Sequence, residues 1–434
     1  MSVSSIGSPP EPACHIPSYA GSRKKEPSLP WPPESVVKSS TDHFNQLRGE
    51  SHMWGLVILI FLTLYGLMGY YIGRKGWKYL IRKDSPVSKV LFIAALLALI
   101  VPFPLSELGK NLLPERIGSW LGIWGGHSMI IVLYLFFLIL MLDVVRFIDR
   151  LAKFIPPAFK NHHFTPYSLA AAVFLLATVP VAYGSWNAQH PVVKKYNVHV
   201  NKDAGEMKQL RIAMVSDIHY GPVIDTDRLK TLQQMIHQIK PDLVLLAGDI
   251  TNGPLPPGED RKLATALGNI KATYGVYAVP GNHDRDLAER GSELMQALKQ
   301  AGIKVLKDEK VVFPNRFTLI GRDDPHLIRE PGRKDLASLM KGTDSSQPLI
   351  LLDHQPIELE QAQKNGIDLM LSGHTHHGQI FPGNWITAMI YENDWGLLQK
   401  GGFYSVVSCG FGTWGPPLRI GNRPEVVEIT MNFT

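Results

Sequence analysis

Four long runs of apolar residues dominate the first half of the chain, at 53–72, 90–105, 121–142 and 166–184. None of the four contains Asp, Glu, Lys or Arg. Because a helix rises about 1.5 Å per residue, a run of roughly 20 apolar residues crosses the hydrocarbon of a bilayer. The pattern therefore predicts a transmembrane region of about four α-helical spans, in preference to the buried helices of a soluble domain.

The pattern changes after about residue 186, where short apolar strands alternate with amphipathic helices. Residues 226–240 place Leu229, Leu232, Ile236 and Ile239 on one helical face, and residues 286–302 behave similarly. The last strand, "EVVEITMNF", alternates as if one of its faces met water. The other predicted strands lie at 210–216, 242–248, 275–279, 317–321, 348–352, 367–372 and 403–408. An α/β domain is therefore expected over residues 186–434.

Residues 1–52 are rich in Pro and Ser and show no sustained periodicity. Such a composition cannot bury a core, so this segment is predicted to be a disordered tail. No apolar stretch follows its basic residues at the spacing of a signal peptide. The expected organisation is a tail (1–52), a helical membrane anchor (53–185) and the α/β domain (186–434).

Charge and cysteine content exclude several classes of function. The chain has 44 Lys and Arg against 38 Asp and Glu, a net charge of +6, and no basic block interleaved with aromatic residues. Nucleic acid is therefore not an expected partner. The two cysteines, Cys14 and Cys409, cannot form a disulfide framework, and Cys409 is expected to be a small buried residue.

The basic residues between the spans predict an orientation. Six Lys and Arg lie between the first two spans and four between the last two, whereas the middle loop has Lys110 and Arg116. The positive-inside rule then places the two richer loops in the cytoplasm and the catalytic domain outside. Lys194 and Lys195, just after the fourth span, argue against this orientation.

Metal-ligand residue types follow five of the predicted strands, where open α/β sheets place their sites. The blocks are "VSDIHYG", "LAGDITNG", "VPGNHDRD", "LLDHQP" and "LSGHTHHGQ". Asp217 and His219 are two residues apart, as are His374 and His376, so an extended backbone points each pair one way. Each block alone is weak, because a lone His is more often structural than a ligand.

In combination and in this order, the five blocks resemble the calcineurin-like metallophosphoesterases, over roughly residues 208–434. The resemblance implies a four-layer sandwich of two mixed β-sheets flanked by helices, with two divalent ions at the strand ends. It assigns Asp249 as the bridging ligand, and imidazole, carboxylate and amide donors suit Mn, Fe or Zn. The implied ligands are Asp217, His219, Asp249 and His376 for one ion, and Asn282, His354 and His374, with Asp249, for the other.

The resemblance further implies direct hydrolysis of a phosphoester by a hydroxide held between the ions. His283 matches the position beside the phosphate and would stabilise the transition state or protonate the leaving oxygen. Asp284 would orient its ring, or else cap a helix. Asn252 stands where many members carry an acid, and His377 replaces a common glycine, which makes it a neighbour of the site and not a ligand.

The sequence says less about the identity of the substrate than about the chemistry of the reaction. Arg322, Arg329 and Arg333 either grip a second phosphate or belong to a solvated loop, and residues 382–396 supply Trp and Ile for an apolar slot or a membrane contact. With the anchor, these features favour a membrane phosphodiesterase, whose substrate is a lipid-linked or a soluble phosphoester. The alternatives are a lipid-linked pyrophosphate hydrolase, such as a UDP-diacylglucosamine hydrolase, and a non-catalytic membrane sensor or scaffold. Oligomeric state is not encoded in these patterns.

Overall fold

The computed structural model describes residues 34–434 apart from 82–84, 110–111, 163–164, 285–291 and 326–331. It divides into two compact units, residues 1–63 and 64–434, and helix α1 (Glu34–Leu80) begins in the first and ends in the second. Of the predicted tail, residues 1–33 lie outside the described part, and α1 begins within the remainder.

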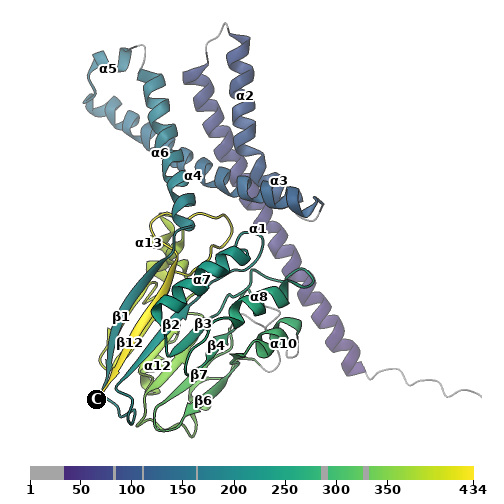
Figure 1. The fold of residues 1–434 in the computed structure, drawn as a ribbon. Helices are drawn as coiled ribbons and strands as arrows, with labels where there is room; N and C mark the ends of the chain where they lie inside the picture. The colour runs from purple at the N-terminus through teal and green to yellow at the C-terminus, as the bar shows by residue number, and fades with distance from the viewer. Residues whose placement is uncertain (1–33, 82–84, 110–111, 163–164, 285–291, 326–331) are drawn as a thin grey trace, which may run out of the picture. The chain divides into compact units, whose positions relative to one another are not determined.

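Helices precede the sheets along the chain (Figure 1), and after α1 they alternate between long and short. They are α2 (Pro86–Ile100), α3 (Pro102–Gly109), α4 (Glu115–Ala152), α5 (Pro157–Asn161) and α6 (Thr165–Ala188). Three segments of the described chain can cross a membrane by length and composition: Gly55–Leu80, Ile117–Ala152 and Thr165–Ala188. The α2–α3 pair becomes a fourth span if it is counted as one helix bent by 40°.

The break between α2 and α3 falls inside the predicted second span, 90–105. It lies at Val101, directly before Pro102. Val101 itself keeps helical dihedral angles (φ −70°, ψ −35°), but Pro102 has no N–H with which to continue the helical hydrogen bonds. The second predicted span is therefore two short helices, the first of which packs on α1: Leu96 fills the space above Gly73.

Two mixed six-stranded sheets form the rest of the chain, as the resemblance implied. The first has the order β1 (Val192–Val200), β12 (Glu425–Phe433), β2 (Gln209–Val215), β3 (Leu243–Ala247), β4 (Val276–Val279), β5 (Ile303–Val305). The second has the order β10 (Gly396–Lys400), β11 (Phe403–Val407), β9 (Leu369–Ser372), β8 (Leu349–Leu352), β7 (Phe317–Gly321), β6 (Glu309–Phe313). Strands β2 to β5 and β7 to β9 run parallel, so the carboxyl ends within each of these sets meet at one edge.

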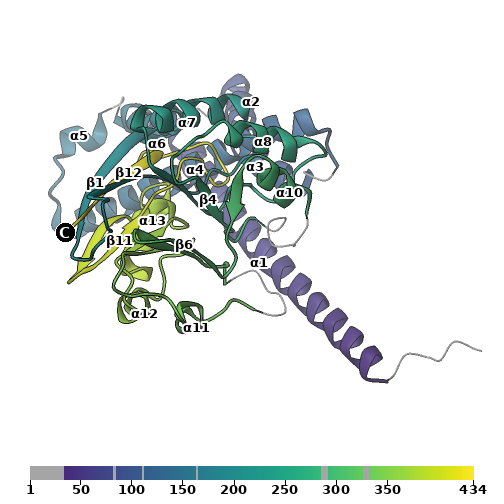
Figure 2. The same cartoon turned by 60° about the horizontal axis from the view of Figure 1, so that its bottom comes forward.

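Helices cover the outer face of each sheet, which gives the four layers seen in Figure 2. Helices α7 (Thr226–Ile239), α8 (Glu259–Gly268) and α10 (Glu293–Gln300) lie on the first sheet, and α11 (Leu336–Met340) and α12 (Leu359–Lys364) on the second. Helix α7 buries Leu229, Leu232, Ile236 and Ile239, the face that its periodicity predicted. The central core lies between the two sheets. Its packing holds the sheets face to face, and with them the loops at the carboxyl ends of their strands.

The helical region and the sheets are joined by a short segment before β12. Leu418 is fully buried against Ile130 of α4 and Val181 of α6. The backbone N–H of Arg419 donates to the carbonyl of Gly184, and the Asn187 side chain donates to the carbonyl of Arg419 at 2.9 Å. The end of the last predicted span is thus bonded directly to the α/β domain.

Candidate metal centre

All seven predicted ligands lie in loops that leave the carboxyl ends of central strands. Asp217 and His219 follow β2, Asp249 follows β3, and Asn282 follows β4. On the second sheet His354 follows β8, whereas His374 and His376 follow β9. Packing of one sheet on the other brings the two sets of loops together.

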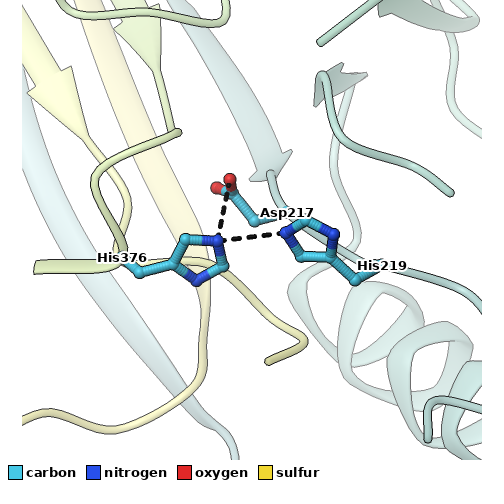
Figure 3. Close-up of side chains that lie close together, drawn as sticks. All are labelled: Asp217, His219 and His376. Atoms are coloured by element: carbon cyan, nitrogen blue, oxygen red, sulfur yellow. Dashed lines mark hydrogen bonds and ion pairs between the residues drawn. The ribbon is translucent and has the colours of Figure 1, made fainter. Parts of the chain in front are cut away.

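The first group of donors consists of Asp217, His219 and His376, all buried (Figure 3). The Nε2 atoms of His219 and His376 are 3.0 Å apart, and Oδ1 of Asp217 is 3.4 Å from Nε2 of His376. With metal–nitrogen bonds of about 2.0–2.1 Å, donor atoms around a tetrahedral ion lie about 3.4 Å apart. The spacing of this group therefore suits a transition metal.

The second group consists of Asp249, His354 and His374, with Asn282 among them. Nε2 of His354 lies 3.3 Å from Oδ2 of Asp249 and 3.2 Å from Oδ1 of Asn282. The same Oδ2 of Asp249 is 3.7 Å from Nε2 of His219, in the first group. Asp249 is thus placed between the two groups, as a bridging ligand must be.

The hydrogen bonds of His354 show that the second group needs positive charge, and against the effect of its burial the neighbouring carboxylates of Asp249 and Asp217 raise the pKa of this imidazole. Its Nδ1 lies 2.8 Å from the carbonyl of Ala247, which can only accept, so Nδ1 carries the proton. In the neutral ring Nε2 then carries no proton, and its lone pair points at the oxygens of Asp249 and Asn282. Three electron-rich atoms converge in a fully buried place, and either a second proton on His354 or a metal ion must compensate them.

Burial and charge in this cluster move several pKa values. Burial opposes ionisation of Asp249, but the neighbouring imidazoles of His354 and His219 hold its pKa below the usual range. Burial lowers the pKa of His219 to about 4 and also lowers that of His376. Burial and the charge of Asp249 raise the pKa of Asp217 to about 6. At His219 and His376 the imidazole is therefore neutral, which is the form in which histidine binds metals.

The backbone of these loops is strained where the donors lie. Asp217, His219, Asp249, His374 and His376 all have φ between 48° and 71°, a region that non-glycine residues seldom enter. Such strain persists only where surrounding structure enforces it, and it concentrates at functional sites. The preceding loop residues must be small: a Cβ at Gly281 would overlap Asp249, and one at Gly373 would overlap Asp217.

His283 and Asp284, the two predicted catalytic residues, both bond to the loop after β3. The His283 ring packs edge-on against the ring of His219, 4.9 Å between centroids, and the backbone N–H of His283 donates to Oδ1 of Asp249 at 2.9 Å. Asp284 is fully buried and accepts from the backbone N–H groups of Ile250, Thr251 and Gly281 at 2.8–3.1 Å. Its described bonds hold two loops together and do not reach the His283 ring.

Arg419 is a residue of the site that sequence reasoning missed. It is fully buried, and its guanidinium donates to the carbonyls of Cys409, Gly410 and Gly412. One nitrogen, Nη2, lies 3.3 Å from Nδ1 of His376. No local pattern marks this arginine, since its carbonyl partners lie seven to ten residues before it and His376 comes from the loop after β9. Cys409 is buried, as expected.

The predicted alternatives for Arg322 and Arg333 are both wrong. Arg322 is 3% exposed and bonds to Asp353 and Glu358, while Arg333 forms two bonds with Asp353. Asp353 is itself fully buried, so these arginines neutralise a carboxylate behind His354. They are therefore neither solvated nor free to grip a phosphate. Arg329 lies outside the described residues.

The two departures from the family pattern lie at the edge of the site. His377 is half-buried, and its Nδ1 lies 2.7 Å from Oδ2 of Asp394, which also accepts from the Thr387 hydroxyl. Asn252 is exposed, and its N–H donates to the carbonyl of Tyr220. Asp394 had no signal in the sequence, because its two side-chain partners, Thr387 and His377, precede it by 7 and 17 residues and match no local pattern.

Comparison with known proteins agrees with this geometry. Residues 210–378, which include all seven donors, match the model of the calcineurin-like phosphoesterases. An uncharacterized metallophosphoesterase of Aquifex aeolicus is 33% identical over 260 residues, covering 59% of this chain and 97% of that protein. The chain belongs to the calcineurin-like metallophosphoesterase family.

Two further relatives bear on the helical region. A Danio rerio transmembrane protein with metallophosphoesterase domain is 34% identical, covering 59% of this chain, which spans 61% of the length of that protein. An uncharacterized metallophosphoesterase of Campylobacter jejuni is 27% identical over 87% of this chain and 99% of its own length. With its apolar helices, the chain fits a membrane-anchored member of the family.

Proposed function

We propose that this protein is a membrane-anchored phosphodiesterase that depends on two divalent metal ions. The observation that carries the proposal is the pair of buried donor groups that share Asp249. Their electron-rich atoms face one another at 3.0–3.7 Å, an arrangement that divalent cations would stabilise. Mixed imidazole, carboxylate and amide donors favour Mn, Fe or Zn.

The proposed ligands are those that the sequence predicted. Asp217, His219 and His376 would hold one ion, and His354, His374 and Asn282 the other, with Asp249 contacting both. Bound there, the ions would supply Lewis acidity toward water and toward the phosphoryl oxygens of the substrate. The family to which the chain belongs is one of phosphoester hydrolases, and all seven positions carry a side chain that can bind a metal.

The chain's own groups would position the reacting atoms. The His283 backbone is fixed by its bond to Asp249, which leaves the ring beside His219 at the mouth of the first group. From there the imidazole would stabilise charge on the phosphoryl group or donate a proton to the leaving oxygen. Asp284 would act as a positioning residue, because it holds the Asn282–His283 loop against the loop after β3.

The remaining parts of the proposal concern location. We assign residues 1–52 as a tail, 53–185 as the anchor and 186–434 as the catalytic domain. The basic loops between the spans favour a catalytic domain on the extracytoplasmic side. Digestion of the α/β domain by protease added to intact cells would support that side, and full protection until lysis would contradict it.

The test of the activity uses the full-length chain in nanodiscs with Mn and bis-p-nitrophenyl phosphate. Asp249→Asn should lower turnover at least a thousandfold and reduce the bound metal from two ions per chain to one or none. Asp227→Asn is the matched control, because that carboxylate is 78% exposed on helix α7 and pairs with Lys230 on the same helix. Wild-type protein that binds metal but shows no metal-dependent turnover would favour the non-catalytic sensor or scaffold.

A further inference from the structure

Helix α13 (Gly383–Ile390) exposes its apolar side chains to a degree unusual for a folded domain. None of its residues is buried. Met389 is 79% exposed, Ile390 67%, Trp385 61% and Ile386 56%. Four large apolar side chains together on one short helix mark an interaction surface, since single exposed residues are normal but a contiguous patch is not.

Two aromatic residues outside the helix extend this surface. Phe381, 42% exposed, packs edge-on against Trp385 with 5.0 Å between ring centroids. Trp414, 58% exposed, is tied to the loop before α13, because its N–H and carbonyl both bond to the Gln379 side chain. We call these six residues the α13 surface: Phe381, Trp385, Ile386, Met389, Ile390 and Trp414.

The α13 surface adjoins the helices that can cross a membrane. The Tyr134 hydroxyl of α4 donates to the carbonyl of Phe381 at 2.7 Å. The loop that carries Trp414 continues into Pro416, which packs directly against Gly126 of α4. The α13 surface is therefore in direct contact with α4, one of the helices that can cross a membrane, so a bilayer around that helix would lie next to it.

The same helix is bonded to the candidate metal centre at both ends. Before it, the backbone of Gly378 lies against Gly383 so closely that neither position has room for a Cβ. After it, Tyr391 packs edge-on against the ring of His374 at 6.1 Å, and Asp394 binds both His377 and Thr387. An eight-residue helix is only about 12 Å long, so whatever contacts α13 also lies near the donors.

We propose that the α13 surface lies in the interfacial layer of the membrane, and that the substrate is a lipid whose phosphodiester head group reaches the metal centre from the bilayer. Trp and apolar side chains on a short helix are the composition that partitions into that layer. The inference rests on the proposed function for the chemistry, but the position of α13 can be measured without any turnover.

The position is tested with an environment-sensitive fluorophore on Met389→Cys, in full-length Cys14→Ser protein in phosphatidylcholine–phosphatidylglycerol vesicles. Cys409 is fully buried and does not compete for the label. We expect quenching by doxyl-labelled lipids and little quenching by iodide. The matched control is Val312→Cys, 55% exposed on edge strand β6, which should show the opposite pattern. Iodide quenching of the label at 389, or protection that depends on protein concentration and not on lipid, would overturn the proposal.

The substrate class is tested with two phosphodiesters that share a leaving group, methyl and hexadecyl p-nitrophenyl phosphate. In nanodiscs, kcat/KM should be at least tenfold higher for the hexadecyl ester than for the methyl ester. Met389→Glu should lower this hexadecyl-to-methyl ratio of kcat/KM at least fivefold. Val312→Glu should keep the wild-type ratio. An equal kcat/KM for the two esters in wild-type protein would refute the lipid substrate, whereas no turnover of either would refute the proposed activity.

Discussion

Asp284 offers a quantitative test of how the metal loops are held. Asp284→Ala removes the acceptor for three buried backbone N–H groups, those of Ile250, Thr251 and Gly281. An unsatisfied buried donor costs about 1–3 kcal/mol, so with partial rescue by water the loss is about 4 kcal/mol. For a domain of this size, 1 kcal/mol corresponds to about 2–4 °C in Tm, which predicts a decrease of about 10 °C.

The assay is thermal unfolding of the full-length chain, followed by intrinsic fluorescence. Asp335→Ala is the control, because Asp335 caps helix α11 through one exposed bond to Ser338 and should cost about 1 kcal/mol. Asp284→Asn should fall between the two, since one acceptor oxygen remains and the new amide faces N–H donors. A decrease for Asp284→Ala no larger than that for the α11 cap would refute the argument that Asp284 joins the loops.

Three further predictions follow from contacts in and behind the site. Arg333→Ala should destabilise the fold by about 3 kcal/mol, because it removes a partner of the buried carboxylate of Asp353. The KM for bis-p-nitrophenyl phosphate should change less than twofold. A tenfold rise in KM would instead indicate that Arg333 binds phosphate. Gly281→Ala should reduce kcat more than a hundredfold, since the added Cβ overlaps Asp249; near-normal kcat would show that the loop can move. Removing metal with EDTA should lower Tm by the equivalent of about 2.7 kcal/mol for each ion lost when the prior metal concentration was a hundred times Kd, and an unchanged Tm would argue against a metal-stabilised site.

Local patterns predicted the elements well where burial follows a regular period. The buried face of α7 and the strands β2, β3, β4, β7, β8, β9 and β11 fall where the sequence places them, give or take one or two residues. Strands β1, β5, β6 and β10 escaped notice because they are short or carry charges among their apolar positions. The predicted second span, 90–105, included Pro102, and the structure breaks the helix at that proline.

In the candidate site, too, local patterns predicted some residues and missed others. Five short blocks, each ending a strand, were enough to nominate seven donors, because parallel strands bring their carboxyl ends to one edge. The roles of Arg419, Asp353 and Asp284 could not be derived, since each depends on a partner from a loop far away in the chain. The local sequence around a charged residue in a polar loop is the same whether that residue is solvated or fully buried.

The sequence by itself therefore determined the apolar helices and the residue types available to bind metals, because periodicity and strand-end chemistry are local properties. The family and the two-sheet architecture followed from the resemblance carried by five strand-end blocks in a fixed order. Only the tertiary structure decided which arginines are buried, what Asp284 holds, and that α13 turns its Trp385 and Met389 outward beside the helical region. Whether a side chain faces solvent, a carboxylate or a membrane is set by contacts between segments far apart in the chain, and a local pattern carries no record of those contacts.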